Sequence, residues 1–410
     1  MIENIYKKQW LCLENWVYVA IHPNQLMLYN TQTGQYIISE AKVAFTIVEK
    51  MHERKKLGVV LYENEWFNNI SARQFIENAV AKNIFTYESY MSDNEKPIRL
   101  MPVLNIQKNA ERLKREYDTS VGEKSLHYLI DLTLYVNNHC NLNCIHCSQS
   151  YKQFSCCFKH NNRSELNLEQ LTKIASHIKF IPLERINIIG GNLFSYHLLD
   201  NLLGIFNEKK SRINLWSHYK NFQISKHDVI WNIIVDFPFD NQLFSNLYLP
   251  DIKETAIIHF IVQNEDEIIL AEKTIEKFNI QNNEIHPFYN GNNDDFFNSC
   301  VFLNKEDIFE NVVKQRQIFC NQALNSNFFG HLTILPNGDV FSNINTPILG
   351  NINEKTILEL ITEEMDKNYS WRKIRNEKPC NLCLFQYLCP PISNYEMIFN
   401  RTNLCTIYEI

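Results

Sequence analysis

Three cysteines stand close together in this chain and constrain it more than any other feature. Cys140, Cys144 and Cys147 follow an apolar run of strand-forming residues at 130–136. Three thiolates on one loop can bind three irons of a 4Fe–4S cube and leave the fourth iron without a protein ligand. A structural cluster or a structural zinc ion normally has all four positions filled by protein. The loop therefore predicts a cluster whose fourth iron is open to a further ligand.

The spacing of these cysteines resembles that of the radical S-adenosylmethionine (SAM) enzymes, with three and then two residues between them. The resemblance implies that the open iron binds the amino and carboxylate groups of SAM, and that an electron then releases a 5′-deoxyadenosyl radical. The alternative is a zinc knuckle with His146 as a fourth ligand. We expect His146 and Cys147 to point in different directions from an extended backbone, which disfavours that closure.

The bulk composition fits an intracellular enzyme of more than one domain. A chain of 410 residues exceeds the usual size of one hydrophobic core. Its formal net charge of -6 predicts no binding to nucleic acid or to an anionic membrane. No apolar run approaches the ~20 residues that span a bilayer, and the N-terminus lacks a signal-peptide core. The 12 cysteines cluster, which indicates metal ligands in a reducing compartment, so we expect a cytoplasmic protein.

Residues 1–95 predict a small domain of their own. Strand-forming runs joined by turns are followed by a helix, and a second helix is expected to begin at Ser71, where the spacing is that of a capping box. The pattern is similar to the small winged-helix domains that bind leader peptides of ribosomally made, modified peptides. This resemblance implies that a leader adds a strand to a sheet edge. The alternative is a cap or oligomerisation domain, and residues 96–128 are expected to be a linker.

The middle segment, residues 129–300, alternates between strand and helix patterns. After the run that precedes the cysteine loop, further strands are expected at 185–189, 213–216, 229–235, 257–262 and 284–288. Such alternation predicts parallel β/α units in a full or partial barrel. The resemblance to radical SAM enzymes implies an α/β fold with a partial (β/α)6-type barrel. Reactive groups in such barrels lie at the C-terminal ends of the strands, where the cysteine loop falls.

The second predicted strand ends in Gly190, Gly191 and Asn192, where radical SAM enzymes usually carry Gly-Gly-Glu. Glycines let the backbone approach a ligand closely, and strand-end carbonyls can accept hydrogen bonds from the SAM amino group. Asn192 keeps an acceptor but loses the usual charge. At the end of the next strand, Ser217 is a possible further contact with SAM.

A second group of cysteines lies near the C-terminus. Cys380, Cys383, Cys389 and Cys405 suit a closed site that holds zinc or a fully ligated cluster. With Cys320 and the Gly-Asp hairpin at 330–340, they look like the SPASM extension of peptide-modifying radical SAM enzymes, here expected over residues 301–410.

Two cysteines of the usual SPASM pattern are replaced in this chain. Asn343 and Ser393 stand where that family carries ligands, and the resemblance implies that both belong to the same auxiliary cluster. We therefore expect one auxiliary 4Fe–4S cluster, held by the four C-terminal cysteines, with zinc as the alternative. It could pass electrons or help to hold the peptide.

Other candidate residues are interpreted as structural. Adjacent cysteines rarely bridge, so Cys156 and Cys157 are assigned no role. Cys320 is left over, and Cys300 is not expected to be its companion. The histidines at 177, 197 and 259 are expected to be packed or surface residues and not ligands.

The sequence as a whole is interpreted as a cytoplasmic radical SAM/SPASM peptide maturase. The expected partners are a precursor peptide, bound through its leader, and an electron donor such as a flavodoxin or ferredoxin. Three types of product remain open: a thioether, a carbon–carbon crosslink or an epimerised residue. Two alternatives stay open: a catalytically weakened relative that escorts the precursor to a partner maturase, and an enzyme that acts on a protein side chain, as in sulfatase maturation.

Overall fold

The computed structural model describes residues 8–99, 125–157, 164–207, 211–224, 227–247, 255–399, 401 and 403–407. Most of the predicted linker, residues 100–124, lies outside these ranges. Within the described ranges, no helix has both the length and the apolar character that crossing a bilayer requires.

The N-terminal part contains two three-stranded antiparallel sheets. One has the order β5-β1-β6 and the other the order β2-β3-β4. The strands are β1 (Gln9–Leu13), β2 (Val17–Ile21), β3 (Leu26–Asn30), β4 (Tyr36–Ser39), β5 (Val59–Tyr62) and β6 (Phe85–Ser89). Helices α1 (Lys42–His52), α2 (Asn64–Asn68) and α3 (Ile70–Ala81) share a buried core with these strands.

The predicted cap of the second N-terminal helix is wrong by two residues, since Asn69 and not Ser71 is the cap. Helix α3 begins at Ile70, and the side chain of Asn69 accepts a hydrogen bond from the backbone N–H of Ala72. An asparagine just before a helix satisfies one of the first free backbone donors. Ser71 therefore lies inside the helix, and the capping-box spacing that begins there is coincidental.

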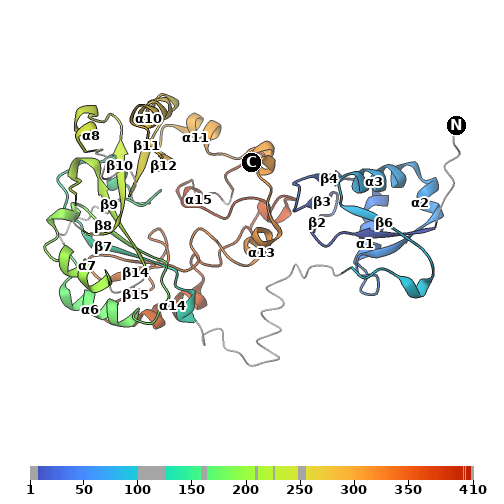
Figure 1. Ribbon diagram of the computed structural model, residues 1–410, viewed down its shortest axis with the longest axis horizontal. Coiled ribbons are helices and arrows are strands. Elements are labelled where there is room, and N and C mark those ends of the chain that lie inside the picture. Colours follow the sequence, from blue (N-terminus) through green and yellow to red (C-terminus); the bar gives the residue numbers. More distant parts are fainter. Residues whose placement is uncertain are drawn as a thin grey trace.

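A nine-stranded sheet forms the larger part of the molecule, with the order β12-β11-β10-β9-β8-β7-β13-β14-β15 (Figure 1). Neighbours from β7 to β12 all pair in parallel. These six strands are β7 (Asp131–Asn137), β8 (Arg185–Gly190), β9 (Arg212–His218), β10 (Ile230–Asp236), β11 (Ala256–Val262) and β12 (Asn283–Pro287). The structure thus confirms a mixed α/β fold with a parallel sheet, and its strands overlap the predicted ones.

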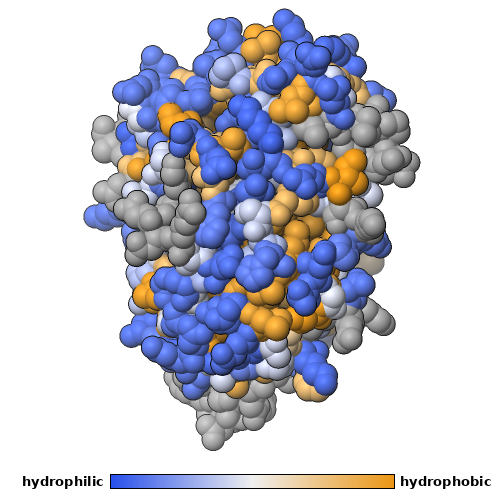
Figure 2. All heavy atoms as spheres, turned by 90° about the vertical axis from the view of Figure 1, so that its left-hand side faces the viewer, coloured by the Kyte–Doolittle hydropathy of each residue, from blue (hydrophilic) through white to orange (hydrophobic). Residues whose placement is uncertain are grey.

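Helices lie between the parallel strands along the chain and cover the outer side of the curved sheet (Figure 1). They are α6 (Leu168–His177), α7 (Leu199–Asn207), α8 (Asn241–Leu247) and α10 (Glu265–Phe278). The outer strand face supplies apolar side chains such as Leu134, Ile188 and Leu215, which are fully buried in one large core with the helices. Seen from this helical side, the surface is largely hydrophilic with apolar side chains showing between (Figure 2).

The opposite face of the sheet, here called the inner face, is more polar. Asn214 Nδ2 donates to Asn187 Oδ1 at 2.9 Å, and Asn187 Nδ2 donates to Thr133 Oγ1 at 3.3 Å. These residues alternate with the apolar ones because successive strand side chains point to opposite faces. The inner face therefore combines hydrogen-bonding groups with two small apolar clusters, one that includes Ile234 and one that includes Ile189.

The C-terminal part extends the sheet and adds short helices. Strand β13 pairs in parallel with β7, and β14 then returns antiparallel to β13, which confirms the predicted hairpin at 330–340. The elements are α11 (Asp294–Cys300), α12 (Lys305–Glu310), α13 (Gln315–Ala323), β13 (His331–Ile334), β14 (Asp339–Phe341), β15 (Gly350–Asn351), α14 (Ile357–Lys367) and α15 (Asn394–Ile398).

The sheet β2-β3-β4 packs against the C-terminal part through one shared apolar cluster. Tyr29 and Met27 from β3 are fully buried there with Leu384 and Phe385. The backbone N–H of Val313 donates to Tyr29 Oη at 2.8 Å. The N-terminal part thus packs directly against the region that carries the C-terminal cysteines.

Candidate metal and cofactor sites

The cysteine loop lies where the ends of three parallel strands meet. It follows β7 and contains the single helical turn α5 (Ile145–Ser148). One small cavity of about 10 Å³ is lined by predicted residues from the loop, from the end of β8 and from β9: Cys140, Cys144, Cys147, Gly190, Gly191 and Ser217. The cavity therefore brings together residues that are far apart in the sequence and that were predicted to be cluster ligands or SAM contacts.

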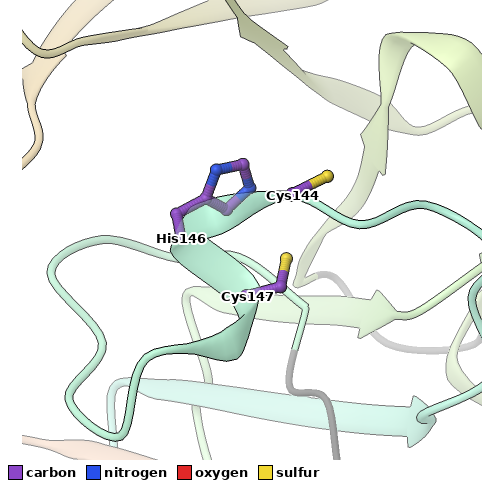
Figure 3. Close-up of side chains that lie close together, drawn as sticks. All are labelled: Cys144, His146 and Cys147. Carbon is purple, nitrogen blue, oxygen red and sulfur yellow. The ribbon is translucent and has the colours of Figure 1, made fainter. Parts of the chain in front are cut away.

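His146 lies closer to the cysteines than expected. The expectation of an extended backbone at His146 and Cys147 is wrong, because residues 145–148 form a helical turn. The ligating atoms of Cys144, His146 and Cys147 all lie within 4.8 Å of one another (Figure 3). His146 is buried, and its Nδ1 finds no hydrogen-bond partner in the described part of the chain. The local geometry thus keeps the zinc alternative open.

Cys156 and Cys157 were assigned no role from the sequence, yet they reach this site. Cys157 lines the same cavity, and its Sγ is 2.8 Å from Cys147 Sγ. Cys156 is buried close by. The signal that could have found them is position: both fall in the connection between β7 and α6 that also carries the three-cysteine motif.

The donor set fits an iron–sulfur cluster in kind, because it consists of thiols on one loop beside glycine backbone. One pair of sulfur atoms, those of Cys147 and Cys157, is closer together than two ligands of one metal ion. Two thiolates on one tetrahedral zinc are ~3.8 Å apart, from Zn–S bonds of about 2.3 Å. Cys147 Sγ and Cys157 Sγ are only 2.8 Å apart, so these two sulfurs would have to separate to bind one metal ion together.

Hydrogen bonds from neighbouring side chains favour the ionised form of Cys144. A hydrogen bond from Cys147, and the nearby His146 and His218, lower the pKa of Cys144 well below its ordinary value. Burial would lower the pKa of His218, but its hydrogen bond to Asp236 and the proximity of Cys144 raise it to about 9. His218 Nε2 lies 3.0 Å from Asp236 Oδ1. His218 Nδ1 accepts a hydrogen bond from the N–H of Lys220 at 3.2 Å, so Asp236 and Lys220 together hold the ring beside Cys144.

The glycine pair at the end of β8 is required by the loop itself. A Cβ on Gly191 would lie 2.3 Å from the carbonyl oxygen of His139, and one on Gly190 would lie 2.6 Å from Asn137 Oδ1. Asn137 Oδ1 also accepts a hydrogen bond from the N–H of Gly191 at 2.9 Å. The sequence predicted that these glycines let the backbone approach a ligand closely. In the structure they approach Asn137 and His139, which lead into the cysteine loop.

Asn192 and Ser217 already have partners within the chain. Asn192 Oδ1 accepts from the N–H of Phe194 at 3.2 Å, which caps a short 3-10 turn, and Asn192 does not line the cysteine cavity. Ser217 lines that cavity, and its hydroxyl donates to the carbonyl of His218 at 3.2 Å. Their roles as SAM contacts stay predictions.

The C-terminal cysteines also meet at one place. Cys380, Cys383, Cys389 and Cys405 line a single cavity of about 20 Å³. Burial raises the pKa of Cys389 to about 12, against the opposing charge of Arg375. Four thiols around one cavity suit a closed site for zinc or a fully ligated cluster.

The two replaced ligand positions of this region are close together and have structural partners. Asn343 Nδ2 donates to Asn394 Oδ1 at 2.8 Å, and Asn394 directly follows Ser393. Ser393 caps α15 in a reciprocal pair with Glu396. Cys320 and Cys300 do not line the cysteine cavity. The expectation that Asn343 and Ser393 replace ligands of one site stays a prediction.

Comparisons with known proteins gave structural likenesses only. No model of a protein family matches the chain, and no curated protein matches it. Streptococcus suis SuiB bound to S-adenosylmethionine matches at 13% identity over 98% of this chain and 100% of that chain, with a TM-score of 0.45. SuiB bound to the precursor peptide SuiA matches at 14% identity over 96% and 98%, with the same TM-score.

A third solved structure, a polyhistidine-tagged anSMEcpe with bound AdoMet, matches at 13% identity over 67% of this chain and 92% of that chain, with a TM-score of 0.42. At such low identity and TM-score, the residues of the cysteine cavities carry the functional argument, and these likenesses do not.

Proposed function

We propose that this protein is a radical SAM enzyme that modifies a ribosomally made precursor peptide. The observation that carries the proposal is the meeting of Cys140, Cys144 and Cys147 with the glycine backbone at the end of β8 in one cavity. A 4Fe–4S cluster held by these three thiolates would supply the electron that cleaves SAM. The chain's own residues position the reactants.

Several residues of the cavity have a role in this proposal. His218 lines the cavity, where Asp236 holds its ring in place with Nε2 3.0 Å from Oδ1. Gly190 and Gly191 bring backbone carbonyls to the strand ends, where an amino group can donate to them. Trp216 contributes an apolar ring to the wall of the same cavity. SAM presents an amino group that could donate to these carbonyls and an aromatic adenine ring that could pack against Trp216.

The domain organisation is part of the same proposal. Residues 1–95 would form the winged-helix-like leader-binding domain, 96–128 the linker, 129–300 the partial (β/α)6-type barrel and 301–410 the SPASM-like extension. Strands β2 and β4 lie at the edges of their sheet, where an extended leader can pair with the backbone. Cys380, Cys383, Cys389 and Cys405 would hold one auxiliary 4Fe–4S cluster, with zinc as the alternative.

Anaerobic reconstitution with iron and sulfide tests this proposal. We expect about eight irons per chain from two 4Fe–4S clusters, and 5′-deoxyadenosine from SAM under strong reduction. Cys144→Ala should lose about four irons and all 5′-deoxyadenosine. The matched control, Cys300→Ala, changes an exposed cysteine of α11 and should keep both. Zinc in place of iron at the cysteine loop would overturn the proposal.

An escort role is the second candidate, because Asn192 replaces the usual acid, accepts from the N–H of Phe194 and does not line the cysteine cavity. An escort would load iron and bind a precursor peptide but form no 5′-deoxyadenosine under strong reduction. The same reconstitution therefore separates the two functions. A precursor reading frame beside the gene would identify the peptide for both.

A further inference from the structure

Three potential metal ligands converge on the inner face of the sheet, beside the cysteine cavity but outside it. His259 lies in β11, and Glu284 and His286 lie in β12. The two strands are parallel with His259 paired to Glu284, so residues 284 and 286 both project toward the face that carries His259. The ligating atoms of all three side chains lie within 4.8 Å of one another.

The individual distances are those expected for ligands of one metal ion. His259 Nδ1 is 2.9 Å from His286 Nε2, and Glu284 Oε2 is 3.5 Å from the former atom and 3.3 Å from the latter. Ligands bound at about 2.1 Å with angles between octahedral and tetrahedral values are separated by ~3.0–3.4 Å. The three donors therefore need to move by only a few tenths of an ångström to share an ion.

A neighbouring amide holds the His259 ring in the orientation that a metal ligand needs. His259 Nε2 is 2.9 Å from Asn232 Oδ1, and an amide oxygen accepts hydrogen bonds but cannot donate them. In the tautomer that donates from Nε2 to this oxygen, the lone pair of Nδ1 faces His286 and Glu284. Metal-binding histidines are usually held in this way, with the second ring nitrogen donating to a fixed acceptor.

The surroundings hold the site rigid on one side and leave it accessible on the other. His259 is buried and stacks on Trp216, with ring centroids 4.6 Å apart. The Glu284 side chain is 57% exposed. Trp216 also lines the cysteine cavity, so its ring is a wall shared by the two sites.

We propose that His259, Glu284 and His286 bind a divalent transition-metal ion such as zinc, with at least one coordination position left open. Two histidines and a carboxylate form a donor set typical of metal sites that keep a position for water or substrate. Metal binding here does not depend on the proposed radical chemistry. If that chemistry holds, the open position would bind a carboxylate, thiolate or hydroxyl of the peptide beside the radical site.

Zinc titration of the full chain tests the proposal, with His286→Ala as the variant. Because cysteines bind zinc as well, the readout is the difference between the two proteins in zinc bound per chain. We expect His286→Ala to bind one zinc fewer than the wild-type protein. The matched control, His197→Ala, removes an exposed histidine paired with Glu165 and should bind as much zinc as the wild type.

Two further readouts are the identity of the atoms bound to zinc and the effect of removing Asn232, which contacts His259. Zinc-edge X-ray absorption of the cluster-loaded protein should show nitrogen and oxygen at about 2.0–2.1 Å, a contribution that His286→Ala lacks. Asn232→Ala should weaken this binding ~10–100-fold, because the orientation of His259 is lost. Circular dichroism would verify that each variant is folded.

Equal zinc stoichiometry in the wild type and His286→Ala would overturn the proposal and leave a hydrogen-bonded His–His–Glu cluster. The test of this zinc site can fail or succeed independently of the test of the proposed radical enzyme. Loss of iron at the cysteine loop with retention of the nitrogen-bound zinc refutes the radical enzyme alone, and the reverse result refutes this site alone.

Discussion

At the scale of single residues, Gly191 shows how little tolerance the cysteine loop has. Its Cα faces the backbone of His139, so that an added Cβ would lie 2.3 Å from the carbonyl oxygen and 2.9 Å from the nitrogen. Backbone atoms cannot rotate out of the way as the end of a flexible side chain can. Only glycine fits at this position, because any Cβ would overlap the backbone of His139; an unusual φ angle is not the reason.

We predict that Gly191→Ala destabilises the protein by about 2–4 kcal/mol, because overpacking against backbone forces the loop to shift. Urea unfolding at neutral pH measures the change. The matched control is Gly204→Ala in α7, where an added Cβ meets nothing within 4 Å. That change should be neutral or stabilising by up to about 1 kcal/mol. Equal stability of the two variants would contradict the contact at His139.

The sequence was informative about the candidate site where spacing along the chain fixes chemistry. The cysteine triplet and the glycine pair follow directly from strand–loop order, and the structure brings them together. Cys157 could not be placed in this way, because its approach to Cys147 depends on the path of the loop after α5. His259 and His286 come from different strands, so only their register brings their rings together.

At the scale of elements, Asp131 joins three neighbouring strands at their N-terminal ends. It lies in β7, and its carboxylate accepts from Arg185 of β8, with Nε to Oδ1 at 2.9 Å. His331 of β13 lies on its other side, with Nε2 to Oδ2 at 3.0 Å. Burial raises the pKa of Asp131, but the hydrogen bonds and charges of His331 and Arg185 outweigh it and lower the pKa below its usual value.

We predict that Asp131→Asn lowers the free energy of unfolding by about 2 kcal/mol at pH 7, a figure reduced because Arg185 is half exposed. The folded-state pKa is depressed, so the ionised carboxylate stabilises the fold above the unfolded pKa, near 4. That stabilisation is lost as the pH falls through the lower, folded pKa. Urea unfolding of both proteins at pH 7 and at pH 3 should show the difference shrinking.

A surface ion pair supplies the control for this measurement. Glu77→Gln removes an exposed partner of Arg73 on α3, at a distance of 4.0 Å, and should change stability by less than about 0.5 kcal/mol. A difference between Asp131→Asn and wild type that stays constant from pH 7 to pH 3 would mean that ionisation of Asp131 does not stabilise the fold.

Most elements could be predicted from their residues, whereas their lateral order could not. Helix α6 illustrates the first point: Asn167 and Gln170 form a capping box, and Leu171 and Ile174 are buried as the apolar spacing predicts. The sheet illustrates the second, since β13 follows β12 in the chain but pairs with β7 at the opposite edge of the parallel set. That pairing depends on long-range packing, which local patterns do not encode.

At the scale of the whole molecule, the N-terminal part and the C-terminal cysteine region share one apolar cluster. Tyr36 of β4 stacks on Phe309 of α12 with ring centroids 3.9 Å apart. Tyr29 is fully buried in the cluster and accepts the hydrogen bond from Val313 N–H at 2.8 Å. Cys383 belongs to the same cluster, so the docking surface reaches the C-terminal cysteine cavity.

We predict that Tyr29→Phe loosens this docking, because it leaves the buried N–H of Val313 without its acceptor at a cost of about 1–3 kcal/mol. Hydrogen exchange of the peptide that contains Val313 should speed up by roughly tenfold or more, since 1.4 kcal/mol corresponds to a factor of about ten. Tyr90→Phe, which removes an exposed hydroxyl bonded to Asp93, should leave this exchange unchanged.

Docking and metal binding at the C-terminal cysteines should also be thermodynamically coupled. If a metal bound by Cys380, Cys383, Cys389 and Cys405 favours the docked arrangement, docking must raise the affinity for the metal by the same factor. Tyr29→Phe should therefore release metal from this site to a competing chelator more readily than Tyr90→Phe does. Retention of metal by Tyr29→Phe at the wild-type level, together with faster exchange at Val313, would show that the two parts dock independently of the cysteine site.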